Sequence, residues 1–361
     1  MGNISSKNAF PVNGKVRDSI PSHPSNPKLT QQKTILITGG SRGMGQEVGH
    51  QLSQKGANIV IVARDPQKLQ QAISYIQLGA SNPETQRFHH ISADLCSATE
   101  CARVIDEVVA WNGAPPDTVW CCAGSAYPAL FVDTPVEQIE KQMASNYMTS
   151  AYMAHATLRS WLKPLEDVQT RDAASSKAEC KSNNPPPARH LIFTASFVAL
   201  YSFAGYAPYS PSKAALRSLS DSLSQEMNLY AAAFPDAPRV RVHTIFPATI
   251  LTESYETENL TKHGLTLQLE EGDEGRTPHV IAERSIKGLE GGEELITTDI
   301  LTWLVKRGVL GGSVRGGFGR VILSWILAGL MGIVMVFVRA DMDRKARTWG
   351  RKFGVARSAK K

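Results

Sequence analysis

Hydrophobic and polar positions alternate along most of this chain in blocks that predict strands and helices in turn. Apolar runs rich in Val, Ile and Phe are typical of buried strands. Seven such runs occur, at 33–38, 58–64, 87–94, 117–124, 189–196, 239–247 and 293–299. Strands that alternate with helices build a parallel sheet with helices on both faces. The sequence therefore predicts an α/β fold with a Rossmann-like, doubly wound sheet.

Two polar stretches interrupt this rhythm. Residues 1–30 are rich in Pro, Ser and Asn, a composition that predicts disorder. Residues 165–189 contain three consecutive prolines and are expected to form a flexible insertion, with a functional lid as the alternative. The folded domain that carries this insertion is expected over 31–300.

The C-terminal part, 301–361, departs from the pattern in another way. Residues 321–338 contain no charge, and this length is close to the shortest that crosses a bilayer. The stretch 339–361 holds nine Lys or Arg and two acids, a net charge of +7 that suits anionic headgroups. We therefore expect membrane association, with a buried core helix as the alternative. Gly329 and Gly332 would permit a hairpin or a shallow insertion with both flanks on one side.

Composition excludes several other classes. A net charge of +6 and 42% hydrophobic residues are ordinary for a globular protein of 361 residues. The basic end lacks the aromatic interleaving and motifs of nucleic-acid binders, so no nucleic-acid partner is expected. Five cysteines without any CxxC predict reduced thiols and no metal site.

The segment "TGGSRGMG" at 38–45 follows a strand and opens a helix. Glycines there let the backbone approach a pyrophosphate at the positive end of the helix, although a packing turn would also need them. The residues expected to touch the phosphates are Gly39, Ser41, Gly43 and Gly45. Asp94 and Leu95, after the third strand, would lie beside the adenine.

Charge at the end of the second strand indicates which dinucleotide binds. Folds that prefer NAD usually have an acid there for the ribose hydroxyls. This chain has Arg64 near that point, with Arg42 in the glycine loop and Lys68 one turn further on. Guanidinium groups suit a 2′-phosphate, so the sequence predicts NADPH as the cofactor. Asp65 is the alternative acid and favours NADH.

Candidate chemistry follows in "YSPSK", where Tyr209 and Lys213 are spaced to share one helix face. A free tyrosine has a pKa of about 10, and a neighbouring ammonium favours the phenolate. Such a pair can give a proton to a ketone near neutral pH. Ser196, thirteen residues before Tyr209 at a strand end, can polarise the substrate oxygen.

The set "TGGSRGMG", "CCAG", "SNYMTS", Ser196 and "YSPSK" resembles the short-chain dehydrogenase/reductase family over about residues 33–250. The resemblance implies that Tyr209 is the acid/base and that Lys213 lowers its pKa and binds the nicotinamide ribose. It implies that Ser196 orients the carbonyl and that Asn146 holds a water linked to Lys213. It also allows a homo-oligomer that pairs through long helices.

Some residues depart from the family pattern. Cys122 stands where the family commonly has Asn, and Ala248 where it has Gly. Neither is a proton-transfer group, so the resemblance still implies an active enzyme. It also implies that Thr38 supports the glycine loop and that Thr252 closes over the nicotinamide.

Four features together make the chain similar to a group within that family, the 3-ketodihydrosphingosine reductases. They are the glycine loop "TGGSRGMG", Arg64 with Lys68, the "ADL" at 93–95 and the apolar C-terminal segment. This likeness implies NADPH-dependent reduction of the C3 ketone of 3-ketosphinganine, at the endoplasmic reticulum membrane with the catalytic domain facing the cytosol. Residues 253–290 would form a substrate lid, whose acids Glu253, Glu256 and Glu258 could meet the substrate amine. The alternatives are a steroid, retinoid or 3-oxoacyl substrate, or a non-catalytic NADPH-binding scaffold.

Overall fold

The computed structural model describes residues 33–162, 186–309 and 318–354. Within these residues, seven parallel strands form one sheet in the order β3-β2-β1-β4-β5-β6-β7, which confirms the predicted doubly wound fold. The strands are β1 (Thr34–Thr38), β2 (Asn58–Ala63), β3 (Phe88–Ser92), β4 (Thr118–Cys121), β5 (Arg189–Thr194), β6 (Val240–Phe246) and β7 (Leu295–Thr297). The segment 1–30 and nearly all of the insertion predicted at 165–189 lie outside the described residues.

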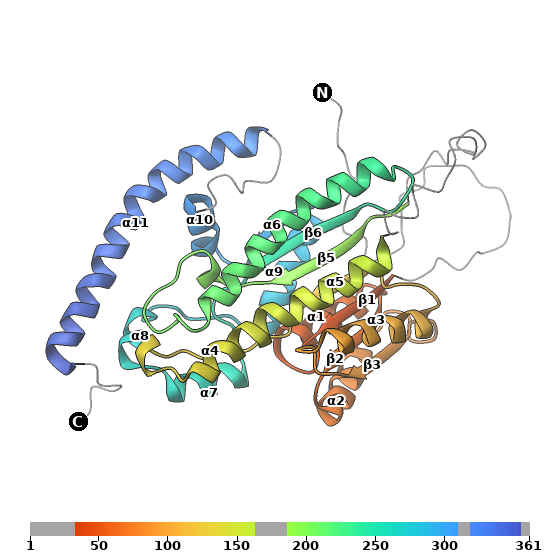
Figure 1. Ribbon diagram of the computed structural model, residues 1–361, viewed down its shortest axis with the longest axis horizontal. Coiled ribbons are helices and arrows are strands. Elements are labelled where there is room, and N and C mark those ends of the chain that lie inside the picture. Colours follow the sequence, from red (N-terminus) through yellow and green to blue (C-terminus); the bar gives the residue numbers. More distant parts are fainter. Residues whose placement is uncertain (1–32, 163–185, 310–317, 355–361) are drawn as a thin grey trace.

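Helices cover both faces of the sheet (Figure 1). One face packs against α1 (Gly43–Gln54), α2 (Pro66–Gln77) and α9 (Pro278–Glu290). The other packs against α3 (Ala98–Asn112), α5 (Thr149–Trp161) and α6 (Ser210–Ala233). Because side chains alternate along a strand, Ile35 and Ile37 contact the first layer and Leu36 the second. Both faces are buried at the centre of the sheet, so β1 is apolar between its two threonines and β2 is apolar after Asn58.

Shorter helices gather beyond one end of the sheet (Figure 1). They are α4 (Val136–Gln142), the π-helix Met143–Met148, α7 (Glu253–Thr261) and α8 (Gly264–Leu269), with the 3-10 turns Phe131–Asp133 and Phe197–Ala199. The lid predicted over 253–290 corresponds only to α7 and α8. The remainder, α9, buries Ile281, Ile286 and Leu289 in the core and therefore belongs to the domain itself.

In the described part of the chain after the last strand, two helices follow: α10 (Ile300–Val309) and α11 (Phe318–Phe353). From Trp325 onward, α11 is long and apolar enough to cross a membrane, judged by length and composition alone. It runs unbroken through Gly329 and Gly332, so of the two predicted arrangements the hairpin is wrong and the shallow insertion stays a prediction. A glycine costs a helix about 1 kcal/mol, which weakens it without forcing a turn.

One face of α11 contacts the folded domain along much of its length, beside α10 and α8 (Figure 1). Met331 is 6% exposed and lies in a core cluster with Val305 of α10. Further along, the Tyr201 hydroxyl donates to Met342 Sδ at 3.5 Å, and the Trp349 ring lies 5.7 Å from His263. These contacts extend over about 27 Å of helix, at 1.5 Å per residue.

Candidate active site

A cavity of about 1850 Å³ opens where the carboxyl ends of the strands meet the glycine loop, α7 and α8. Ligands of doubly wound folds bind in this crevice, beside the point where strand order reverses between β1 and β4. Of the predicted catalytic and cofactor-binding residues, all but Asn146 line it: Gly39, Ser41, Arg42, Gly43, Gly45, Arg64, Lys68, Asp94, Leu95, Ser196, Tyr209 and Lys213.

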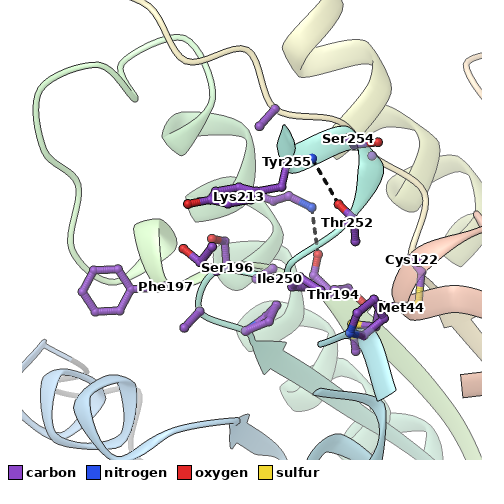
Figure 2. A pocket seen from close by; sticks show the side chains of 18 of the residues that line it. Met44, Cys122, Thr194, Ser196, Phe197, Lys213, Ile250, Thr252, Ser254 and Tyr255 are labelled. Carbon is purple, nitrogen blue, oxygen red and sulfur yellow. Dashed lines mark hydrogen bonds between the residues drawn. The ribbon is translucent and has the colours of Figure 1, made fainter. Parts of the chain in front are cut away.

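The three residues expected to handle the substrate carbonyl lie together. Tyr209 precedes α6, and Lys213 lies one turn into that helix, with its amine 5.8 Å from the centre of the Tyr209 ring. The amine donates to the carbonyl oxygen of Thr194 at 2.9 Å (Figure 2). Ser196, just after β5, hydrogen-bonds Tyr209. The end of β5 therefore brings the Tyr209 hydroxyl and the Lys213 ammonium to the same wall of the cavity.

Electrostatics at this wall differ from the sequence expectation. Burial, and then the Glu258 carboxylate, raise the pKa of Tyr209, while the bond to Ser196 opposes the rise. Burial lowers the pKa of Lys213 to about 8, because the charged form loses hydration. The predicted lowering of the Tyr209 pKa is thus not found in the protein by itself. At neutral pH the phenol keeps its proton, which is the state that a proton donor needs.

Asn146 lies just behind the cavity, in the π-helix Met143–Met148. It is fully buried, its amide donates to the carbonyl oxygens of Ser125 and Gln142 at 2.9 Å, and its Oδ1 accepts from Ser125 N at 3.0 Å. A Cβ on Gly124 would lie 2.4 Å from that Oδ1 and 3.3 Å from Lys213 Nζ. Asn146 and Lys213 therefore approach each other across one glycine, as expected for residues that share a water.

The unusual Cys122 has a structural partner. The Thr194 hydroxyl donates to its sulfur at 3.4 Å, which links the ends of β4 and β5. Burial raises the pKa of Cys122 to about 12, so the thiol is neutral. Thr38 holds the same loop, because its hydroxyl accepts from the amides of Cys122 and Ala123 at 3.1 and 3.2 Å. Thr38 thus supports the loop after β4 directly.

Two glycines of the 38–45 loop are required by close approach. Gly39 has φ +66°, and a Cβ there would lie 2.8 Å from the backbone of Ala123. A Cβ on Gly45 would lie 2.5 Å from the carbonyl oxygen of Gly39. Any larger residue would push the loop away from the amino end of α1, where unpaired N–H groups attract phosphate. The loop is therefore shaped for a dinucleotide.

Three cations line the adenine side of this loop. Arg42, Arg64 and Lys68 are exposed to the cavity, and none forms an ion pair with a described residue. Asp65, the competing acid, is engaged elsewhere, because its carboxylate accepts from the amides of Gln67 and Lys68 at 2.9 and 3.1 Å. It caps the amino end of α2, a role that Asp fills well.

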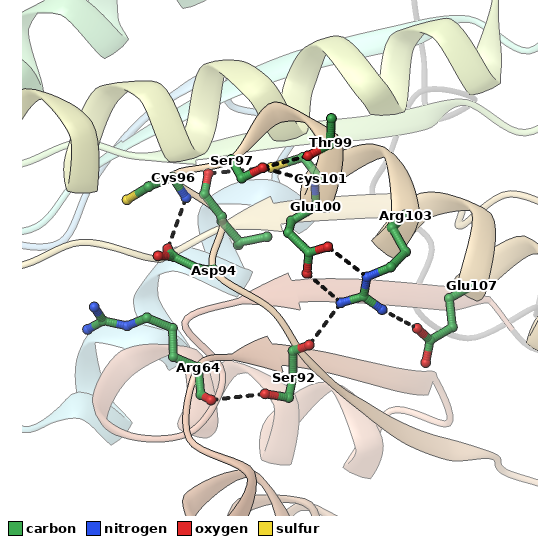
Figure 3. A network of polar contacts seen from close by, with 11 residues as sticks. Arg64, Ser92, Asp94, Cys96, Ser97, Thr99, Glu100, Cys101, Arg103 and Glu107 are labelled. Atoms are coloured by element: carbon green, nitrogen blue, oxygen red, sulfur yellow. Dashed lines mark hydrogen bonds and ion pairs between the residues drawn. The ribbon is translucent and has the colours of Figure 1, made fainter.

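Hydrogen bonds from side chains to backbone carbonyl oxygens join the ends of β2 and β3 (Figure 3). The Ser92 hydroxyl donates to the Arg64 carbonyl oxygen at 2.9 Å, and Arg103 binds the Ser92 carbonyl oxygen and the carboxylates of Glu100 and Glu107. The Arg64 side chain points away from this cluster, so its guanidinium keeps its hydrogen-bonding capacity.

The two residues expected beside the adenine have different surroundings. Asp94 is exposed and accepts from Cys96 N at 3.1 Å, which shapes the turn. Leu95 is 5% exposed and packs in the core, so little more than its backbone faces the cavity.

Several lining groups have no sequence signal that would identify them. The Thr194 carbonyl oxygen is backbone, and Met342 comes from α11. Thr252, by contrast, was predicted from the sequence to close over the nicotinamide. Its hydroxyl caps α7 by accepting from Tyr255 N at 3.2 Å (Figure 2). Its methyl group would lie 3.3 Å from a Cβ on Gly43. Only the folded chain brings these groups together.

Comparison with known proteins agrees with this geometry. The short chain dehydrogenase family matches residues 33–167 and 188–263. The chain belongs to this family.

Relatives in this family cover almost the whole chain. A 3-ketodihydrosphingosine reductase of Aspergillus fumigatus is 46% identical over 91% of this chain and 88% of its own length. One from Neurospora crassa is 39% identical over 98% of this chain and 87% of its own length.

Solved structures show the same fold. A short-chain dehydrogenase/reductase from Mycobacterium ulcerans has a TM-score of 0.57 at 20% identity, over 74% of this chain and 88% of its own. One from Salmonella enterica serovar Typhi also has a TM-score of 0.57 at 20% identity, over 77% of this chain and all of its own.

As a member of the short chain dehydrogenases, the protein is an oxidoreductase that uses a nicotinamide cofactor. The residues present fit such a group. The glycine loop leaves room for a pyrophosphate, and Lys213 lines the same cavity near both Tyr209 and Asn146.

Proposed function

We propose that the protein reduces the C3 ketone of 3-ketosphinganine to the alcohol of sphinganine, with NADPH as reductant. One observation carries this proposal. The cavity lined by Ser196, Tyr209 and Lys213 is also lined by apolar side chains of α10 and by Met342 of α11. The apolar lining residues of α10 are Ile300, Leu301 and Trp303. A long alkyl chain can therefore lie along α10 and α11 while its polar end reaches Tyr209. The names of the relatives at 46% and 39% identity support the same substrate.

The chain's own groups supply the proton chemistry. A bound nicotinamide would supply hydride to the carbonyl carbon. Ser196 donates a hydrogen bond to the carbonyl oxygen and so polarises it. Tyr209, held neutral by burial, gives its proton to that oxygen as negative charge develops there. Lys213, about half charged near pH 8, then stabilises the phenolate that remains.

NADPH rather than NADH is proposed on the charges around the glycine loop. A 2′-phosphate requires cations that can still donate hydrogen bonds. Arg42, Arg64 and Lys68 meet this requirement, because none of them forms an ion pair with a described residue. NADH would require a free carboxylate, but Asp65 already accepts two amide hydrogens at the start of α2. The balance of charge thus favours the phosphorylated cofactor.

The protein is proposed to act at the endoplasmic reticulum membrane, with α11 lying in the plane of the cytosolic leaflet. At 100° per residue, the exposed apolar side chains Trp325, Ile326, Ile333 and Phe337 lie opposite Met331 and Trp349, which contact the domain. The exposed face continues into exposed arginines, which suit anionic headgroups: Arg344, Arg347 and Arg351. A helix attached to the domain along its length lies on a bilayer more readily than it crosses one.

Two measurements test the membrane proposal. The protein should float with vesicles that contain anionic lipid, and the double variant Trp325→Ser, Phe337→Ser should float less. In sealed microsomes a C-terminal tag should be digested by added protease. A protected tag would mean that α11 crosses the bilayer and would overturn the in-plane orientation.

The activity is tested with purified protein, NADPH and 3-ketosphinganine, beside a steroid ketone and retinal. The expected result is NADPH oxidation that depends on 3-ketosphinganine and yields sphinganine by mass spectrometry. Tyr209→Phe is the matched control, since it removes the proton donor and keeps the ring. Higher kcat/KM for the steroid or for retinal would assign the cavity to that substrate instead.

A further inference from the structure

An acidic side chain lies in the cavity beside the proposed proton donor. Glu258, on α7, is mostly buried and lines the cavity together with Tyr209, and its charge acts on the Tyr209 hydroxyl. Of the other acids on α7, Glu253 is exposed at the cavity edge, and Glu256 is exposed and does not line the cavity. Only Glu258 combines burial with closeness to Tyr209.

Among the residues that the structure describes, no cation forms an ion pair with this carboxylate. Lys262, the residue that follows α7, has a fully buried side chain but forms its ion pair with Glu270 at 2.7 Å. Glu270 also accepts a hydrogen bond from Tyr206, so the Lys262 charge is already matched. None of the described cations forms an ion pair with Glu258, whose hydrogen-bond donor is the Ala126 amide. Burial raises the pKa of Glu258, and the Lys262 charge, which forms no ion pair with it, opposes only part of this rise.

A mostly buried carboxylate without an ion-pair partner of its own destabilises a fold, so its presence in a cavity points to a ligand. The ligand that compensates it is a cation small enough to enter beside Tyr209. An ammonium group meets this need, because it donates three hydrogen bonds as a compact charge. The proposed substrate carries an ammonium on the carbon next to its ketone, so a carbonyl at Tyr209 brings that ammonium to the Glu258 side.

We propose that Glu258 binds the ammonium of a 2-amino-3-ketone substrate and selects it over ketones that lack the amine. The inference rests on the proposed function, and it assigns the substrate's polar end to α7. Glu258 is a substrate-binding residue here and takes no proton in the reaction.

The test compares two ketones, 3-ketosphinganine and the same chain with hydrogen in place of the amino group. Wild-type protein should prefer the amine by roughly 10- to 150-fold in kcat/KM, the range of a charge-assisted hydrogen bond. Glu258→Gln keeps an acceptor for the Ala126 amide, removes the charge, and should bring the ratio close to one. Glu256→Gln, on the exposed side of the same helix, should keep the wild-type ratio.

An unchanged ratio of kcat/KM in Glu258→Gln would overturn the inference. Equal kcat/KM for the two ketones in the wild-type protein would also overturn it, and this measurement needs no variant. Binding distinguishes a failure of the proposed reaction from a failure of this assignment. If neither ketone is reduced, the protein is titrated with sphinganine and with the same alcohol lacking the amine. The ratio of the two affinities then tests the contact with Glu258. A preference for the amine that disappears in Glu258→Gln supports the contact, and equal affinities refute it.

Discussion

Replacing Gly124 with alanine tests the geometry of the candidate site without any cofactor. The new Cβ would lie 2.4 Å from Asn146 Oδ1 and 3.3 Å from Lys213 Nζ, where ordinary contacts begin at 3.4 Å. The backbone of Gly124 does not have a positive φ, so the effect comes from the clash alone.

Asn146 cannot move aside cheaply. It is fully buried and bonded to Ser125 and Gln142, so rotation would break one or two hydrogen bonds. Overpacking costs about 1–3 kcal/mol and each lost neutral hydrogen bond about 0.5–1.5 kcal/mol. The free energy of unfolding should fall by about 2–4 kcal/mol. At roughly 2 °C per kcal/mol for a chain of this size, the Tm falls by about 4–8 °C.

Thermal unfolding of Gly124→Ala followed by circular dichroism measures the effect, and reductase assays should show lower kcat/KM because Lys213 is displaced. Gly350→Ala is the control, since a Cβ there meets nothing within 4 Å and alanine favours a helix. A variant at Gly124 that melts with the wild type and keeps full activity would refute the approach of Asn146 and Lys213 described here.

Three further outcomes are expected. Tyr209→Phe should lower kcat by about 10²–10⁴-fold, which is the contribution of a general acid, and nicotinamide fluorescence should show unchanged NADPH binding. Activity at the wild-type level would show that Tyr209 does not donate the proton. Arg64→Asp should lower kcat/KM with NADPH by about 10- to 100-fold and raise it with NADH, and an unchanged preference would contradict the proposed phosphate contact. Lys213→Met should be inactive yet as stable as the wild type or more so at pH 7. Burial lowers the pKa of Lys213 to about 8, so between pH 8 and 10.5 this lysine is protonated in the unfolded chain and neutral in the folded one. The free energy of unfolding of the wild type should therefore rise by about 3 kcal/mol relative to Lys213→Met as the pH increases across that window. Urea unfolding at several pH values measures this difference, and a constant difference would contradict the buried charge.

Local patterns in the sequence determined much of this protein. Seven apolar runs predicted the seven strands, because a buried parallel strand must be apolar on both faces. The glycine loop and the pair Tyr209 and Lys213 were also predictable, since one turn of helix fixes which residues share a face. The apolar stretch after residue 320 was predicted as a helix-length membrane segment for the same local reason.

Only the tertiary structure decided how charges behave. Asp65 and Arg64 are neighbours in sequence, but the cap of α2 engages one and leaves the other facing the cavity. Burial set the pKa directions of Tyr209 and Lys213, and burial depends on packing between segments far apart in the chain. Glu258 differs from the other acids of α7 for the same reason.

Sequence patterns likewise did not predict the orientation of α11. Its composition permits a span, a hairpin or a helix on the membrane surface, and hydrophobicity alone does not choose among them. Contacts of Met331, Met342 and Trp349 with the catalytic domain are long-range, and they align the helix with the cavity. Residue order determines which elements form, whereas the free energy of packing them together determines which surfaces meet the substrate.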